Sequence, residues 1–173
     1  MNVLEYSHSV SPSKHLPDLL LLGDPRLYER CEPVSEADLP QLPQIAADLR
    51  QVMAEVREKY RFGRGIAAPQ LGYMKRVIYL DTDRPRLLIN PELSERSPEM
   101  FELWDDCMCF PHLLVRVQRH RRVTVKYLNE NWESQTWAVE DDLSELIQHE
   151  YDHLEGVLCT MRAVDEKSFK WKV

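Results

Sequence analysis

Apolar residues recur at helical spacing in two stretches of the chain. In the first stretch, the residues that share one face, with charges opposite, are Ile45, Leu49, Val52, Met53, Val56 and Tyr60. This pattern predicts an amphipathic helix over roughly 43–60, which Pro43 can begin because proline fits the first turn. In the second stretch the apolar positions are Leu143, Leu146, Ile147 and Leu154. We expect a C-terminal helix there, with Asp142 and Glu145 at capping-box spacing and Gly156 just past its end.

Short apolar runs between these two helices predict strands. The predicted strands are 76–81, 87–90, 123–128 and 132–139. Pro91 is expected to end the second strand, and 129–131 is expected to form a hairpin between the last two. Leu19 to Leu22 is expected to be a short buried strand or turn. The order of elements favours an α+β fold, with antiparallel or mixed sheets packed around the C-terminal helix and one amphipathic helix near the N-terminus.

Length and composition indicate a soluble globular protein. The 173 residues suit a single domain, 1–173, and residues 1–17, which contain several serines and prolines, are expected to form a loosely ordered arm. Hydrophobic residues make up 43% of the chain and charged residues 29%, and no apolar run reaches the length of a membrane span. The formal net charge of -7 argues against a nucleic-acid partner, whose binding would require phosphate neutralisation.

Two further features bear on surface and compartment. Arginines at 116, 119, 121 and 122 alternate with valines, which predicts a solvated strand face. The N-terminus lacks the features of a signal or import sequence, so we expect a cytoplasmic protein. In that reducing compartment the four cysteines are expected to be thiols or metal ligands.

The strongest chemical signal is His149-Glu150-x-x-His153 in the C-terminal helix. Residues four apart share a helix face, so both imidazoles can reach one metal ion. Glu150 lies beside them, where it could take a proton from a water molecule. The sequence therefore predicts a metal site with His149 and His153 as ligands.

A third protein ligand is needed, and three cysteines are candidates. Cys159 lies six residues beyond His153, the spacing of the third ligand in metzincin proteases, but only twenty residues follow His153 and Met161 comes too early for that family's methionine turn. Cys107 from mid-chain is the better candidate. If its segment were a straight strand, Cys109 would point the same way, so either the chain bends or Cys109 lines the site without binding.

A glycine- and alanine-rich stretch, Gly63 to Gly72, allows close approach of the backbone to another group. Gln70 is its notable polar residue. Its amide could donate to a developing oxyanion or simply be solvated at the surface, and spacing alone leaves both interpretations open.

With these stretches in hand, the chain resembles the peptide deformylases. That family carries three ordered blocks: Gly-x-Gly-Φ-Ala-Ala-x-Gln, Glu-Gly-Cys-Leu-Ser and Gln-His-Glu-x-Asp-His-Leu. The first matches from Gly63 to Gln70 and the third from Gln148 to Leu154, whereas the middle block keeps only Cys107. Its other positions hold Asp105 for Glu, Asp106 for Gly, Met108 for Leu and Cys109 for Ser.

The resemblance implies a fold, a reaction and a set of residues. One divalent metal ion, typically Fe(II) in the family, with Zn, Ni or Co also suited to these ligands, would bind to Cys107, His149 and His153. Glu150 would be the general base, and the Gln70 amide and the Met108 backbone N–H would stabilise the oxyanion. The residues implied at the substrate are Gly65, Ile66, Asp106 and Arg119.

The implied substrate is an N-formylmethionyl peptide, without a nucleic-acid or membrane partner and with a transient ribosome contact possible. Asp106 could narrow the cleft or change substrate choice, so two alternatives stay open: an amidase for other N-acylated peptides or small amides, and a non-catalytic metal-binding relative. His112 is expected at the surface. Asp152 is expected to support the helix or the metal ligands.

Overall fold

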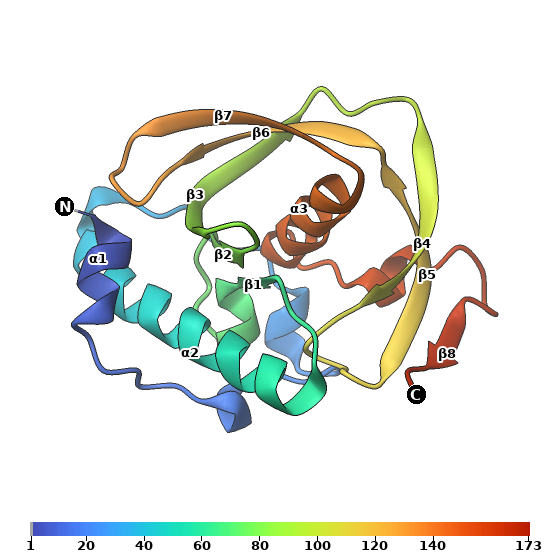
Figure 1. The fold of residues 1–173 in the computed structure, drawn as a ribbon, viewed down its shortest axis with the longest axis horizontal. Helices are drawn as coiled ribbons and strands as arrows, with labels where there is room; N and C mark the ends of the chain where they lie inside the picture. The colour runs from blue at the N-terminus through green and yellow to red at the C-terminus, as the bar shows by residue number, and fades with distance from the viewer. Residues whose placement is uncertain (1) are drawn as a thin grey trace.

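Two antiparallel sheets surround one central helix in the computed structural model, which describes residues 2–173 (Figure 1). The five-stranded sheet has the order β1 (Gly65–Ala67), β2 (Val77–Asp81), β3 (Pro85–Ser94), β6 (Arg122–Leu128) and β7 (Ser134–Glu140). The three-stranded sheet has the order β4 (Met100–Asp106), β5 (Leu113–His120) and β8 (Phe169–Trp171). The helices are α1 (Val3–His8), α2 (Leu42–Tyr60) and α3 (Asp141–Leu154). These elements confirm the predicted α+β class.

The predicted helical faces are the buried ones. Ile45, Leu49, Val52 and Val56 of α2 pack into a core with Tyr79 and Ile89 from the five-stranded sheet. The apolar side of α3 packs on the other face of that sheet, where its partners include Ile78, Leu80, Val123 and Val125. In Figure 1, α3 lies between this sheet and the β4–β5 pair. Because α3 is enclosed by these strands, the side chains on its inner face are buried.

Several local expectations were wrong. Residues 3–8 of the arm form α1, whose Val3 side chain is buried in the α2 core, so this part is not loosely ordered. β3 continues through Pro91, because a bulge between Ile89 and Glu92 takes the proline out of the regular ladder. Of the two alternatives for Leu19 to Leu22 the strand was wrong and the turn is found, with the first two side chains buried and the last two exposed.

The C-terminal helix differs from its prediction at one end. It begins at Asp141 with Glu140 as the N-cap, two residues before the cap expected at Asp142. Glu145 does not close a capping box but pairs with Arg64 on the loop before β1. At the other end, Gly156 adopts a positive φ of 71° just after the helix, as predicted. None of the helices between residues 2 and 173 combines the length and the apolar character of a membrane span.

Candidate active site

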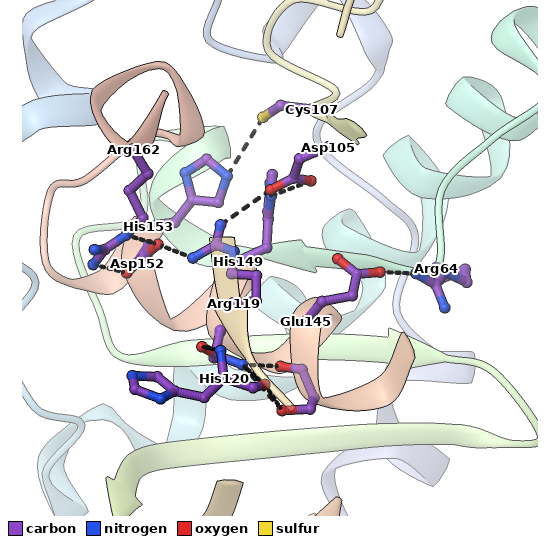
Figure 2. Close-up of polar contacts among 12 residues, drawn as sticks. Arg64, Asp105, Cys107, Arg119, His120, Glu145, His149, Asp152, His153 and Arg162 are labelled. Carbon is purple, nitrogen blue, oxygen red and sulfur yellow. Dashed lines mark hydrogen bonds and ion pairs between the residues drawn. The ribbon is translucent and has the colours of Figure 1, made fainter. Parts of the chain in front are cut away.

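The structure brings Cys107 against the two histidines of α3. The Cys107 Sγ lies 3.5 Å from Nε2 of His153, and the ligand atoms of Cys107, His149 and His153 all lie within 4.8 Å of one another (Figure 2). All three residues are buried, at 2%, 5% and 2% exposure. One sulfur and two imidazoles, converging from two parts of the chain that lie more than forty residues apart, form a compact set of potential metal donors.

The chain bends directly after β4, and this bend places Cys107. β4 ends at Asp106, and the N–H of Phe110 donates to the Cys107 carbonyl at 3.1 Å to close a turn. The Cys109 carbonyl accepts from the N–H of Leu22 at 3.0 Å, which holds the turn against the N-terminal segment. Cys109 follows within this turn, and the Gln70 Nε2 lies 3.4 Å from its Sγ and 3.9 Å from that of Cys107.

A chain of buried charges supports His149 from behind. Asp105 accepts from Nδ1 of His149 at 2.9 Å and from the Arg119 guanidinium at 3.0 Å. The same guanidinium donates to Asp152 at 2.5 Å, and Arg162 donates twice to that carboxylate, at 2.6 and 2.7 Å (Figure 2). This arrangement fixes the tautomer of His149 and leaves its Nε2 directed at Cys107 and His153.

Electrostatics at the two imidazoles differ. Burial alone would lower the pKa of His149, but the Asp105 carboxylate outweighs it and raises this pKa to about 10. Burial would raise the pKa of Asp105, yet His149 and Arg119 hold it at about 2. For His153, burial and the nearby His149 lower the pKa well below its ordinary value, so its ring is neutral. A neutral imidazole is the form that binds a metal.

The donor set fits a divalent cation. Burial, with two further thiols nearby, raises the pKa of Cys107, so a cation is needed to stabilise its thiolate. His153 Nδ1 is buried without a hydrogen-bond partner among residues 2–173, so the polar contact of this ring is the one from Nε2 to Cys107. A cation at Nε2 of His149 would displace the proton from that nitrogen, while Nδ1 keeps the proton that it donates to Asp105.

A second group of donors lies next to the first. It consists of Asp105, His149 and Cys159, the last at the start of the short 3-10 helix Cys159–Arg162. Asp105 is already engaged by His149 and Arg119, and this group contains only one of the two motif histidines. The Cys107 group is therefore the better cation site, and the metzincin interpretation of Cys159 has little support.

Glu150 faces a cavity of about 370 Å³ that also exposes Cys107 and His149. Its Oε2 is buried without a hydrogen-bond partner in the described chain, and burial raises the pKa of its carboxyl group to about 7. Gly65 makes room for it, since a Cβ at Gly65 would lie 3.0 Å from Oε1 of Glu150 and 2.8 Å from Leu80 Cδ2. An unpaired carboxyl group that titrates near neutrality is suited to accept and return a proton.

Gln70 is buried at 1% exposure and lines the same cavity, so it is not a surface residue. Its Oε1 accepts from the Ala67 N–H at 2.8 Å, which identifies Nε2 as the end that faces the thiols. Met108 also lines the cavity, and its side chain reaches the position of Gly63, where a Cβ would lie 2.6 Å from Met108 Cε. Gln70 and Met108 thus line the same cavity as Glu150.

The four residues implied at the substrate are placed differently. Gly65 and Asp106 line the cavity, whereas Ile66 has a fully buried side chain in the α2 core. Arg119 is only 2% exposed and does not line the cavity. The prediction that it lies on a solvated strand face was wrong, because Asp105 and Asp152 bind its guanidinium inside the protein. Arg119 is a positioning residue for His149.

Sequence reasoning missed three features of the cavity. Phe62 and Trp104 form part of its wall, and Lys172 pairs with Asp106 at the wall. Each depends on contacts between distant parts of the chain. The signal available in the sequence was weak: an aromatic residue beside each of two motifs and a lysine near the C-terminus. His112 is exposed, as expected, and its ring stacks on Trp171 with centroids 5.3 Å apart.

The fold and the site together define a class of protein, an α+β protein with a candidate metal centre on a buried helix. A family model described as polypeptide deformylase matches residues 17–169. The chain belongs to the peptide deformylase family, a family of metal-dependent enzymes.

Similarity to individual relatives covers most of the chain. A peptide deformylase of Treponema pallidum (strain Nichols) is 40% identical over 151 residues, which is 87% of this chain and 89% of that protein. The structure of a peptide deformylase from Synechococcus elongatus in complex with actinonin is similar with a TM-score of 0.80 and 33% identity, over 91% of this chain and 84% of the other. The structure of the Thermotoga maritima peptide deformylase is similar with a TM-score of 0.75 and 34% identity, over 85% of this chain and 97% of the other.

Proposed function

We propose that this protein removes the formyl group from N-formylmethionine at the start of new polypeptides. The observation that carries this proposal is the unpaired carboxylate of Glu150 in one cavity with Cys107 and His149, whose ligand atoms also lie within 4.8 Å of that of His153. A divalent cation held by those donors would supply the Lewis acidity that makes water nucleophilic near neutral pH. We propose Fe(II) as that cation, following the family.

Glu150 would take the proton from the attacking water and later pass it to the leaving amine. The pKa of this carboxyl group is raised to about 7, which supports the role because the same group must act first as a base and then as an acid. A cation at the donor set would lower this pKa and favour the ionised form at the start of the reaction.

Gln70 and Met108 would stabilise negative charge on the formyl oxygen. The Gln70 amide is oriented by its bond from Ala67, so Nε2 has one hydrogen toward the thiols and one for a ligand. The backbone N–H of Met108, in the turn after Cys107, would be the second donor.

The edge of the five-stranded sheet would bind the peptide backbone. β1 is the edge strand, and the N–H of Asp81 in β2 donates to the Arg64 carbonyl at 2.9 Å. Because antiparallel pairs alternate, the N–H and C=O of Gly65 then point away from β2, toward the cavity that Gly65 lines. A peptide could add to this edge as a strand, with the Ile66 side chain fixed in the core. We place the reaction in the cytoplasm, where the protein would meet peptides as they leave the ribosome.

Replacing Glu150 with glutamine tests the proposal. We expect Glu150→Gln to lower kcat for a formyl-Met peptide by at least about 100-fold, because the base is lost, while bound metal is unchanged. Glu140→Gln, at the exposed start of the same helix, is the matched control and should deformylate normally.

Three substrates decide between the proposed function and its alternatives. The assay compares formyl-Met, acetyl-Met and small-amide substrates with anaerobically prepared protein. Activity on formyl-Met alone supports a deformylase, and preference for another acyl group indicates the amidase alternative. Normal turnover by Glu150→Gln would refute the assignment of the base.

A further inference from the structure

Lys172 contacts two residues that line the active-site cavity. Its ammonium group pairs with the Asp106 carboxylate and lies 3.4 Å from the ring centroid of Phe62. Both Asp106 and Phe62 line the cavity that contains Glu150. The C-terminal end of the chain therefore contributes a side chain to the rim of the site.

The tail is held at this position by several contacts. β8 pairs with β5 in the register Leu113↔Trp171 and Leu114↔Lys170, and the N–H of Lys172 donates to the His112 carbonyl at 2.8 Å. In Figure 1, β8 lies along the outer edge of β5 with the C-terminus beside it. Lys170 lies 4.0 Å from the ring centroid of Trp104, another wall residue. Side chains two apart share a strand face, so Lys170 and Lys172 are directed to the same rim.

Asp106 depends on the tail for its counter-charge. Two other carboxylates in the cavity wall have partners from elsewhere, because Asp105 pairs with Arg119 and Glu145 pairs with Arg64. The partner of Asp106 is Lys172, with the two side chains 36% and 27% exposed. Both groups are thus within reach of a peptide that enters the cavity.

We propose that the Asp106–Lys172 pair determines which peptides the enzyme prefers, by setting the charge at the mouth of the cavity. With the pair intact, the Asp106 charge is neutralised and Lys170 leaves the rim slightly positive. Without Lys172, the carboxylate would face the residues that follow formyl-methionine and repel acidic ones. This inference rests on the deformylase function proposed above.

The test uses three peptides, formyl-Met followed by Asp, Ala or Lys, and the full-length protein with its metal bound. We expect Lys172→Met to lower the ratio of kcat/KM for the Asp peptide to that for the Lys peptide by about two- to fivefold, the size of a solvent-exposed charge effect. Asp106→Asn should raise the same ratio. Lys167→Met, an exposed lysine in the same tail, should leave it unchanged.

Two results would overturn the proposal. One is an unchanged ratio in both Lys172→Met and Asp106→Asn, and the other is an equal loss of activity on all three peptides, which would mean that Lys172 only supports the fold. Asp106→Asn keeps the test decisive if Lys172→Met does not fold. Should the unaltered enzyme deformylate none of the peptides, the proposed function itself would have failed instead.

Discussion

At the scale of single residues, the site depends on side chains whose partners are distant in sequence. His149, Glu150 and His153 are neighbours on one helix, so their local spacing was enough to predict their arrangement. Arg119 was misassigned because its partners, Asp105 and Asp152, lie 14 and 33 residues away, and an alternating pattern reveals only which face a residue occupies. The pattern could not show that this arginine is neutralised within the protein.

Asp105 is the residue whose role can be tested most simply. Asp105→Asn would leave His149 without its carboxylate partner and leave Arg119 with Asp152 alone. We expect metal affinity to fall about 10- to 100-fold, because the ring would lose both its orientation and its basicity. Competition with a chelator would measure the change.

Asp105→Glu is the control, since it restores the side chain found at this position in the family's motif. It should keep most of the affinity. Metal binding by Asp105→Asn that equals that of the unaltered protein would show that the carboxylate does not support the ligand.

At the scale of elements, α2 was predicted well because its apolar face is long and regular. β4 was not predicted, and β5 was indicated only as a solvated strand face, since charged residues interrupt both and each is stabilised by the ladder between them. α1 was missed because six residues carry little periodic signal, and burial of Val3 against the α2 core supports it. In each case the missing information was a contact with another element.

Asp48 links three elements, and its stability contribution should depend on pH. It is fully buried on α2 and accepts from the Ser13 N–H at 2.6 Å and from the Tyr73 hydroxyl at 2.6 Å. Burial would raise the pKa of this carboxyl group, but hydrogen bonds from Tyr73 and Ser13 outweigh it and lower the pKa. A carboxyl group whose pKa is lower in the folded than in the unfolded protein stabilises the fold at pH values above its unfolded-state pKa. This stabilisation is lost as the pH falls through the folded-state pKa.

We therefore expect Asp48→Asn to reduce the free energy of unfolding at pH 7 by about 1–3 kcal/mol. The difference from the unaltered protein should shrink as pH falls below about 4, where the carboxylate becomes protonated. Urea denaturation at pH 7 and at a pH below about 4 measures this difference in unfolding free energy, with Glu58→Gln on the exposed side of α2 as control. A difference that stays constant with pH would contradict the role of the charge.

At the scale of the whole molecule, the fold assembles one site from three separated stretches. The loop and strand at 63–70 supply Gly65 and Gln70, the turn after β4 supplies Cys107, and α3 supplies the histidines and Glu150. The sequence could indicate these stretches because each carries its own motif. It could not place the C-terminal tail beside the cavity, because β8 is three residues long and its position depends on pairing with β5.

The central claim is that Cys107, His149 and His153 jointly bind one metal ion. Anomalous diffraction from a crystal of the metal-loaded protein, collected at the metal edge, tests it most directly. The account predicts one peak at bonding distance from the Cys107 sulfur, about 2.3 Å, and from one nitrogen of each histidine, about 2.0–2.1 Å, if zinc is used as the probe. A peak bound to Cys159 and Asp105, or one that leaves His153 out of bonding range, would contradict it.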